Sequence, residues 1–278
     1  MTDTSSVPKT IFGYEVLDRL GDGAGSRLYV VSKPRTGQLY ALKHVQPKDE
    51  KEQRYVDQLR NEFEVSKVFR HPALRKSVDL QTRRRLFGAV VEAALVMELV
   101  DGVALDRDRP EELPALIDCF EQTAVALTTL HNLLYVHCDL KPGNILRQAN
   151  GLVKLIDFGQ ACSLGTIKKR VQGTPDFIAP EQVRLNAVGV YTDIYNLGAT
   201  LYWALTGQKV PTLMTVRRRD RDVVREQTFP KPIELRPELP VALSDLVMGC
   251  VNVNPKLRPQ TMNELLKGLA PFGLRRTH

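Results

Sequence analysis

Two short stretches in the second half of the chain hold polar residues that could do chemistry. Asp139, Lys141 and Asn144 lie in the segment VHCDLKPGNIL (residues 136–146), and Asp157 follows the apolar stretch LVKLI. The first stretch brings a carboxylate, a cation and an amide oxygen into one loop. Carboxylate and amide oxygens are ligands that divalent cations accept in proteins. The two stretches therefore predict chemistry on a charged group with help from a metal ion.

The residues around Asp157 support this interpretation. A rigid strand in front of Asp157 would fix the position of its carboxylate. Phe158 would fill the core behind it, and Gly159 would let the backbone turn away sharply. We expect a metal site with a switch attached.

Two features of the first half could bind an anion. In LGDGAGSRLYVV (residues 20–31), closely spaced glycines would let backbone N–H groups approach a polyphosphate. This segment does not open a helix, which argues against a dinucleotide-binding fold. Lys43 lies within an apolar strand, where its ammonium needs an anion, and Glu62 could pair with it. A purely structural hairpin and a lysine that reaches solvent are the alternatives.

The apolar pattern predicts the elements that position these residues. Residues 12–45 alternate around Gly-rich turns, as antiparallel strands do, and residues 49–70, 116–130 and 194–205 show helical spacing. We predict an α+β, bilobal fold. Residues 13–100 would form a small antiparallel β lobe with one helix, and residues 101–270 a larger, mainly helical lobe. Residues 1–12 and 271–278 would be flexible tails. Clefts between lobes are common ligand sites.

Composition argues against several protein classes. The 278 residues, 43% hydrophobic and 26% charged, are typical of a globular protein. The longest apolar run, residues 86–100, contains Glu92 and Glu98 and falls short of a membrane span. The N-terminal sequence lacks the apolar core of a secretory signal, so we expect a cytoplasmic protein.

Charge and cysteine content point the same way. The net charge of +7 and the arginine runs at 83–85 and 217–219 suggest nucleic acid, but acidic residues follow the second run closely. A solvated face or an anionic-substrate patch is the better interpretation. The four cysteines (Cys119, Cys138, Cys162 and Cys250) stand far apart in the sequence, and we expect free thiols.

Together these motifs resemble the signature set of the protein kinase family, from about Tyr14 to Leu269. Lys43 and Glu62 stand where the family has an ion pair, Asp139 and Asn144 match its catalytic loop, and Asp157 opens its metal-binding motif. GTPDFIAPE (residues 173–181), Asp193 and Arg258 resemble later motifs, with Arg258 as the partner of Glu181. The sequence DLKPGN, with Lys141 two residues after Asp139, is similar to that of Ser/Thr kinases. The segments DLKPGNIL and YTDIYNLGATLYWALTG resemble the eukaryote-like kinases of bacteria.

The resemblance implies a Ser/Thr protein kinase that transfers the γ-phosphoryl group of MgATP to a protein hydroxyl. Asp139 would orient that hydroxyl and accept its proton. Lys141 would stabilise the transferring group, and Asn144 and Asp157 would hold Mg²⁺, with Mn²⁺ as the alternative ion. The residues implied to bind ATP are Gly21, Asp22, Gly23, Ala24, Gly25 and Ser26 in the loop, Lys43 with its partner Glu62, and, around the adenine, Leu28, Ala41, Met97, Glu98, Val100 and Leu146.

Some positions depart from the family pattern. Ser26 and Gly25 replace the usual glycine and aromatic of the loop, which predicts a softer lid over ATP. Cys138 replaces an arginine that normally pairs with a phosphate on the activation loop, so activity should not require phosphorylation of Ser163 or Thr166. Ser66 replaces an apolar residue of the family, so Glu64 is an alternative to Glu62 as the partner of Lys43.

Two other functions remain open. A nucleotide-binding pseudokinase scaffold would fit the altered loop and Cys138. A small-molecule phosphotransferase of related fold would share the catalytic Asp and Asn, but it would not explain GTPDFIAPE together with Arg258. The expected partners are a protein substrate and, if the sequence is the whole gene product, a separate regulatory or scaffold protein. Gly143 occupies a position that is acidic in relatives selecting Arg-rich substrates, so such a substrate is not expected.

Overall fold

A computed structural model gives the fold, and it describes residues 8–23, 25–86, 88–216 and 222–274. The chain forms two compact units. The first, here called the β unit, comprises Met1–Val68 and Arg75–Asp101, and the second, the helical unit, comprises Phe69–Leu74 and Gly102–His278. Among the described residues, every helix is too short or too polar to span a lipid bilayer.

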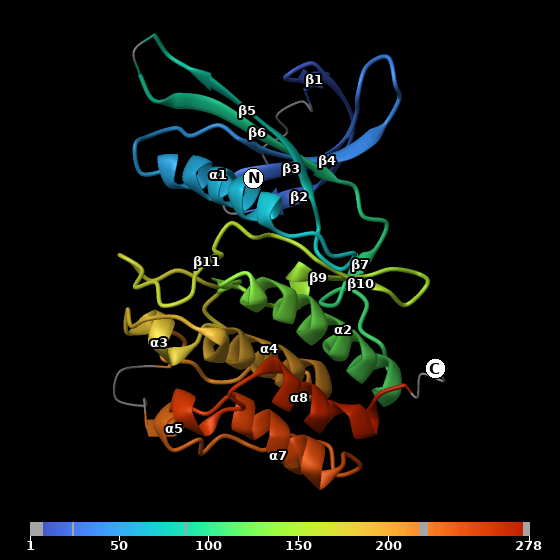
Figure 1. The fold of residues 1–278 in the computed structure, drawn as a ribbon, viewed down its shortest axis with the longest axis vertical. Coiled ribbons are helices and arrows are strands. Elements are labelled where there is room, and N and C mark those ends of the chain that lie inside the picture. Colours follow the sequence, from blue (N-terminus) through green and yellow to red (C-terminus); the bar gives the residue numbers. More distant parts are fainter. Residues whose placement is uncertain (1–7, 24, 87, 217–221, 275–278) are drawn as a thin grey trace, which may run out of the picture. The chain divides into compact units, whose positions relative to one another are not determined.

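The β unit is built on a six-stranded antiparallel sheet in the order β1-β2-β3-β4-β6-β5. One helix, α1 (Gln53–Val68), runs along the sheet (Figure 1). The strands are β1 (Thr10–Ile11), β2 (Tyr14–Gly23), β3 (Ser26–Ser32), β4 (Leu39–Val45), β5 (Ser77–Arg84) and β6 (Val90–Glu98).

Side-chain alternation along β4 explains how this unit positions Lys43. Successive side chains of a strand point to opposite faces of its sheet. Tyr40 and Leu42 belong to one apolar cluster, whereas Ala41 and Val45 belong to another that includes residues of α1. Lys43 therefore shares the sheet face that α1 covers.

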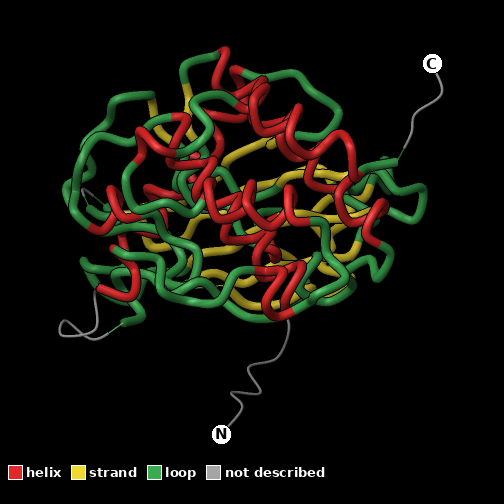
Figure 2. The backbone as a smooth tube through the Cα atoms, turned by 90° about the horizontal axis from the view of Figure 1, so that it is seen from below, coloured by secondary structure: helices red, strands yellow, loops and turns green. Residues whose placement is uncertain are grey.

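The helical unit is built around four longer helices: α2 (Leu113–Asn132), α4 (Val190–Thr206), α7 (Val241–Cys250) and α8 (Met262–Leu269). Loops join them with the short helices α3 (Pro180–Val183), α5 (Asp222–Arg225) and α6 (Pro232–Leu235). Figure 2 shows the helices of the chain in red and its loops in green. Gly207 ends α4 in the left-handed conformation, with φ 73°, which glycine adopts without strain. Two small sheets pair β9 (Ile145–Arg147) with β7 (Val103–Ala104) and β10 (Val153–Leu155), and β8 (Tyr135–Val136) with β11 (Cys162–Ser163).

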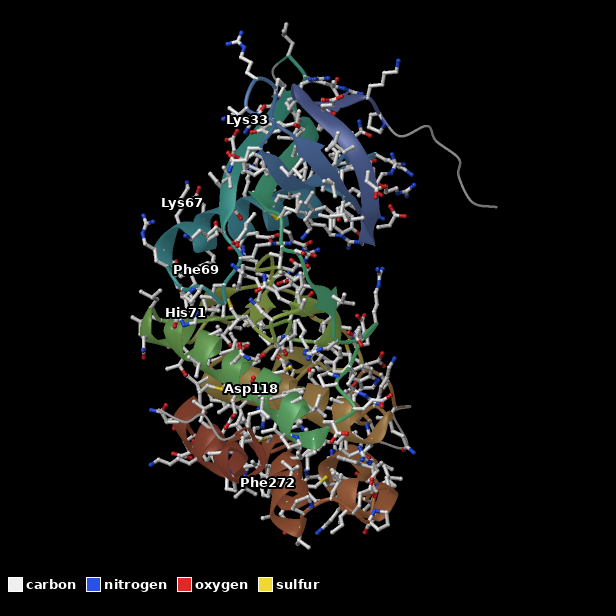
Figure 3. The ribbon with its side chains drawn as sticks, turned by 90° about the vertical axis from the view of Figure 1, so that its right-hand side faces the viewer. Lys33, Lys67, Phe69, His71, Asp118 and Phe272 are labelled. Carbon is white, nitrogen blue, oxygen red and sulfur yellow. The ribbon has the colours of Figure 1, made fainter. Side chains whose placement is uncertain are left out.

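The α+β class predicted from the sequence is confirmed, with a strand-rich first unit and a helix-rich second one. The segment Phe69–Leu74 was expected in the β lobe but belongs to the helical unit. The reason is local packing, because the Leu155 N–H donates to the Ala73 carbonyl (2.7 Å) and Phe69 packs against Phe158 with ring centroids 4.9 Å apart. Figure 3 labels Phe69 and His71 in this segment.

Three boundaries differ from expectation. Residues 10 and 11 are not part of a flexible tail, because they pair with β2 as β1 and bury Ile11 in the core. At the other end, the expected tail begins inside a short helical turn, Ala270–Phe272. The helix with apolar spacing over residues 194–205 was expected to open at Thr192-Asp193, but it begins at Val190, with Gly189 as its extended N-cap residue. The remaining expected tail residues, 1–7 and 275–278, and the arginine run at 217–219 lie outside the described residues.

Candidate active site

Lys43 and Glu62 form an ion pair inside the β unit. Lys43 Nζ lies 3.1 Å from Glu62 Oε2, and the glutamate is 1% exposed. Its second oxygen, Oε1, accepts a hydrogen bond from Arg75 Nη2 at 2.8 Å, and Arg75 is itself buried. Glu64 instead pairs with Lys67 on the surface. One buried carboxylate therefore holds two cations, and the partner of Lys43 is Glu62 rather than Glu64.

Ser66 fits into α1 without disturbing it. The side chain is 6% exposed, and its hydroxyl donates to the Phe63 carbonyl at 2.8 Å. A buried hydroxyl that finds a backbone acceptor avoids the cost of an unsatisfied polar group. The polar substitution at this position is thus accommodated by the helix itself.

The glycine-rich segment is a β2–β3 hairpin, as the sequence predicts. The register pairs Gly21 with Leu28 and Gly23 with Ser26. Gly25 has φ 73°, and a Cβ there would overlap the ring of Tyr55 on α1. An aromatic residue could not occupy this position without moving Tyr55. Of the expected loop residues, Ala24 lies outside the described part of the chain.

Asp22 and most of the expected adenine-binding residues of the β unit lie on strands of its sheet. Asp22 pairs with Arg19 on the strand surface (2.6 Å), and this hydrogen bond lowers the pKa of Asp22. Ala41 and Met97 are paired between β4 and β6 and are buried. The Glu98 N–H donates to the Lys76 carbonyl at 2.9 Å. Val100 follows β6 within the same unit, whereas Leu146 belongs to β9 of the helical unit.

The loop after β8 collects the expected catalytic residues of the helical unit. Asp139 Oδ1 accepts hydrogen bonds from both the N–H and the hydroxyl of Thr174, each at 2.8 Å. Lys141 Nζ donates to the same hydroxyl (3.0 Å) and lies 3.5 Å from Asp139 Oδ2. Asn144 Nδ2 donates to the Asp139 backbone carbonyl at 2.8 Å. Asp139, Lys141, Asn144 and Thr174 thus form one polar network.

A buried carboxylate on α4 fixes the backbone in front of Asp139. Asp193 is fully buried, and its two oxygens accept from the N–H groups of His137 and Cys138, each at 2.9 Å. His131 Nε2 lies 2.9 Å from Asp193 Oδ2. Burial alone would raise the pKa of Asp193, but the hydrogen bond from His131 and nearby positive charge hold it below its ordinary value. The ionised carboxylate supports the strained backbone at Cys138, whose φ is 64°.

Asp157 ends the segment after β10 with its carboxylate turned back on the following turn. Its φ is 65°, and its Oδ1 accepts from the Gly159 N–H at 3.3 Å. Phe158 is 1% exposed and packs against Phe69 and His137, with ring centroids 4.9 and 5.3 Å away. The aromatic side chain therefore fills the core of the helical unit next to the metal-binding candidate.

A second buried ion pair supports the segment that follows. Both guanidinium nitrogens of Arg258 reach Glu181, at 2.9 and 3.0 Å, and the two side chains are 0% and 4% exposed. Arg258 also donates to the backbone carbonyls of Asn252 and Tyr191, each at 2.7 Å. Next to it, Gln182 Nε2 donates to the Cys138 carbonyl at 2.7 Å. The segment that begins α3 is thereby tied to the catalytic loop.

Comparison with known proteins identifies the family. The family model described as "Protein kinase domain" matches residues 14–268. The chain belongs to the protein kinase family. Serine/threonine-protein kinase PknA of Mycobacterium tuberculosis is 30% identical, over 90% of this chain and 59% of that protein. Serine/threonine-protein kinase TIO of Arabidopsis thaliana is 30% identical, over 88% of this chain and 18% of that protein. Serine/threonine-protein kinase PknB of Mycobacterium leprae is 28% identical, over 91% of this chain and 42% of that protein.

The resemblance to the protein kinase family is confirmed, and so is the similarity to bacterial members of that family. The chain spans less than two thirds of the length of each of these relatives. Members of the protein kinase family use ATP and a divalent metal ion in general. The donor set of this kinase domain fits that requirement, because Asn144 commits its amide nitrogen to Asp139 and leaves its oxygen for a metal. Asp157 would add carboxylate oxygens of the kind that such ions prefer.

Sequence reasoning missed two residues of the kinase site. Thr174 was quoted only as part of a motif, although its hydroxyl links Asp139 to Lys141. Arg75 was not noticed, although it shares Glu62 with Lys43. Thr174 is 35 residues from Asp139 in sequence. An Arg directly after the apolar residues that follow His71-Pro72 was the available signal for Arg75.

Proposed function

We propose that the chain is a Ser/Thr protein kinase that transfers the γ-phosphoryl group of MgATP to protein hydroxyls. The observation that carries this proposal is the network joining Asp139, Lys141 and Thr174. It places a carboxylate and a cation about one hydroxyl, which is the arrangement that a general base and a charge-stabilising lysine need. The Ser/Thr-kinase names of the relatives add support.

Each residue has a defined role in this proposal. When bound, MgATP supplies the phosphoryl group and neutralises its charge. Asp139 orients the substrate hydroxyl and accepts its proton, and Lys141 stabilises charge on the transferring group. Lys43 holds the phosphates in the position that Glu62 sets. Asn144 and Asp157 hold Mg²⁺, with Mn²⁺ as the alternative ion. The loop residues from Gly21 to Ser26 cover the phosphates, and the apolar residues that the resemblance names contact the adenine.

The ion pair of Glu181 and Arg258 favours a protein substrate over a small molecule. It is buried, bidentate and bonded to two backbone carbonyls, so it makes a rigid base for the segment before α3. That segment contains Thr174, which contacts Asp139 directly. A stable platform beside the catalytic carboxylate suits an extended peptide, which must be held on both sides of its hydroxyl.

The decisive experiment compares the wild-type chain with Asp139→Asn in a radiolabelled ATP assay. The substrates are the chain itself and a generic basic protein, followed by phosphoamino-acid analysis. Glu64→Gln serves as the matched control, because Glu64 is an exposed carboxylate on α1 that pairs with Lys67. We expect phosphoserine or phosphothreonine from the wild type and the control, and at least about a 100-fold loss in Asp139→Asn.

A different result would favour the scaffold function. If no variant transferred phosphate although wild-type chain bound ATP, the pseudokinase interpretation would replace the enzyme. Transfer to a small-molecule hydroxyl but to no protein would point to the related phosphotransferases. Transfer that survives Asp139→Asn unchanged would remove Asp139 from its proposed role.

The substrate motif can be tested separately. Gly143 has no side chain, but the Asp106 carboxylate lies 3.2 Å from where its Cβ would be. We propose that this site accepts a single basic residue and does not require an arginine run. A peptide library should show weak preference at one position, and strong selection of Arg at several positions would contradict this.

A further inference from the structure

Two cysteines that stand apart in the sequence meet in the helical unit. Cys138 Sγ and Cys162 Sγ are 3.7 Å apart. Cys138 is fully buried in a small apolar cluster with Val136 and Val188, against which Cys162 packs. The pairing of β8 with β11 sets this contact, because Cys162 lies opposite Val136 in the register. All four cysteines of the chain are free thiols, as the sequence predicted.

The two sulfur atoms differ in chemical character. The hydrogen bond from Cys138, helped by the charge of Lys168 and the Thr166 hydroxyl, lowers the pKa of Cys162 to about 7 against the effect of burial and of Asp193. The same hydrogen bond, together with burial, raises the pKa of Cys138 well above its ordinary value. Cys162 is also the partly exposed member of the pair. A thiolate with some access to solvent is the reactive form of cysteine.

The other two thiols lack these features. Cys119 and Cys250 are buried, and burial raises the pKa of Cys119 to about 11 and that of Cys250 to about 12. Such thiols stay protonated and are poor nucleophiles. They provide an internal reference within the same molecule.

We propose that Cys138 and Cys162 form a redox modification site, which a peroxide converts reversibly into an intramolecular disulfide. The Cys162 thiolate attacks one oxygen of hydrogen peroxide, the O–O bond breaks, hydroxide leaves, and Cys162 becomes a sulfenic acid. The Cys138 sulfur then attacks the sulfenic sulfur, the S–O bond breaks, and the departing hydroxide takes the Cys138 proton as water. Overall, two thiols and one peroxide give one disulfide and two waters, with two electrons passing from sulfur to oxygen.

The bond requires the two sulfur atoms to move closer together, and the surroundings of the two residues differ. Cys138 is held at both peptide groups, since its N–H donates to Asp193 Oδ1 (2.9 Å) and its carbonyl accepts from Gln182 (2.7 Å). Cys162 is only partly buried and lies in the two-residue strand β11, opposite Val136 of β8. The sulfurs need to approach from 3.7 Å to about 2.05 Å. We infer that Cys162 moves and that the catalytic loop stays in place.

The disulfide would clamp the start of the activation segment onto the catalytic loop. It closes a loop from residue 138 to residue 162 and holds β11 against β8. Residues 164–171 follow β11, with Ile167 and Val171 exposed. Cross-linking lowers the freedom of the unfolded and locally opened chain. An arginine at Cys138 would need a phosphate to order this segment, whereas the cysteine pair does so by oxidation.

Peptide mapping of the wild-type chain tests the site directly. The chain is treated with hydrogen peroxide, alkylated and digested. We expect a cross-linked peptide pair containing Cys138 and Cys162, while Cys119 and Cys250 are alkylated, and dithiothreitol should restore four thiols. In Cys138→Ser, dimedone should trap Cys162 as a sulfenic acid, and in Cys162→Ser the Cys138 thiol should remain unmodified.

Two further readouts test the clamp and do not depend on phosphate transfer. The oxidised chain should unfold at a temperature at least about 3 °C higher than the reduced chain. Trypsin should cleave after Lys169 and Arg170 at least about fivefold more slowly. Neither change should occur in Cys162→Ser under the same peroxide treatment, which corrects for oxidation elsewhere.

The proposal has clear contrary results. Oxidation of Cys162 to the sulfinic acid without a cross-link, or equal oxidation of all four cysteines, would overturn the disulfide. A cross-link that leaves tryptic cleavage unchanged would overturn the clamp. Because every readout is a mass, a melting temperature or a cleavage rate, failure of the proposed kinase activity would leave this result intact.

Discussion

The hydroxyl of Thr174 should matter for catalysis far more than for stability. It donates to Asp139 Oδ1 (2.8 Å) and accepts from Lys141 Nζ (3.0 Å), so both bonds involve a charged group. Hydrogen bonds to charged groups contribute about 1.5–3 kcal/mol each. Thr174→Val keeps the shape of the side chain but removes both bonds.

The expected magnitude follows from what remains in the variant. The Thr174 backbone N–H still donates to Asp139 Oδ1 at 2.8 Å, so the carboxylate keeps one fixed partner. Only interactions that strengthen toward the transition state change the rate. If one of the two lost bonds acts in this way, about 1.5–3 kcal/mol becomes roughly a 10- to 100-fold fall in transfer rate.

The assay is the radiolabelled phosphate transfer described above, at saturating MgATP, with thermal unfolding measured alongside. Thr174→Ser is the matched control, because it keeps the hydroxyl and loses only a methyl group. We expect Thr174→Ser to stay within about threefold of the wild type and both variants to unfold within a few degrees of it. A Thr174→Val chain of nearly wild-type rate, or a serine variant as slow as the valine variant, would refute the reasoning.

Three other predictions concern stability, pH and regulation. Arg258→Met should lower the free energy of unfolding by about 3–5 kcal/mol, because it leaves Glu181 buried and unpaired; denaturant unfolding measures this, and a loss below about 1 kcal/mol would contradict it. Burial holds the pKa of His44 in the folded protein below its ordinary value. As the pH falls below about 6.5, His44 therefore becomes protonated in the unfolded chain before it does in the folded protein. The free energy of unfolding should decrease over this range until the pH reaches the lower pKa of the folded state. Melting curves between about pH 7.5 and pH 5.5 should show the decline, and His44→Gln should make it shallower. The double variant of Ser163 and Thr166 to Ala should keep nearly full transfer activity, and a 100-fold loss or more would mean that phosphorylation there is required.

Local pattern was enough to predict several of the longer elements, but not α7 or α8. Alternation predicted the antiparallel strands around Lys43, and helical spacing predicted α1, α2 and α4, because burying one face of an element imposes a period on its sequence. The pairing of Lys43 with Glu62 could be inferred, since an ammonium in an apolar strand needs an anion and Glu62 stands nine residues before His71, although Glu64 stayed open as the alternative. In these cases the physical demand and the signal lie in the same stretch of chain.

Contacts between distant stretches could not be predicted in this way. The approach of Cys138 to Cys162 depends on the register of two-residue strands, which carry almost no periodic signal. Arg75 was not noticed because nothing in the sequence around it shows that its guanidinium reaches Glu62, 13 residues earlier. The place of Phe69–Leu74 in the helical unit depends likewise on contacts with the residues around Asp157, namely the Leu155–Ala73 hydrogen bond and the packing of Phe69 on Phe158. These contacts depend on how distant parts of the chain are placed in the fold, which the residue types alone do not predict.

The double anchoring of Glu62 has a consequence for how this protein can be dissected by mutation. Where a single lysine both contacts the phosphates and holds the glutamate of the helix, replacing that lysine by methionine removes the phosphate contact and also releases the helix, so the two losses cannot be separated. Here Arg75 would continue to hold Glu62 Oε1 in Lys43→Met, and α1 would stay tied to the segment before β5. The complementary variant, Arg75→Met, keeps the lysine and loosens only the helix. Lys43→Met, Arg75→Met and the double variant therefore form a double-mutant cycle, in which the proposed phosphate contact of the lysine and the position of α1 can be varied separately.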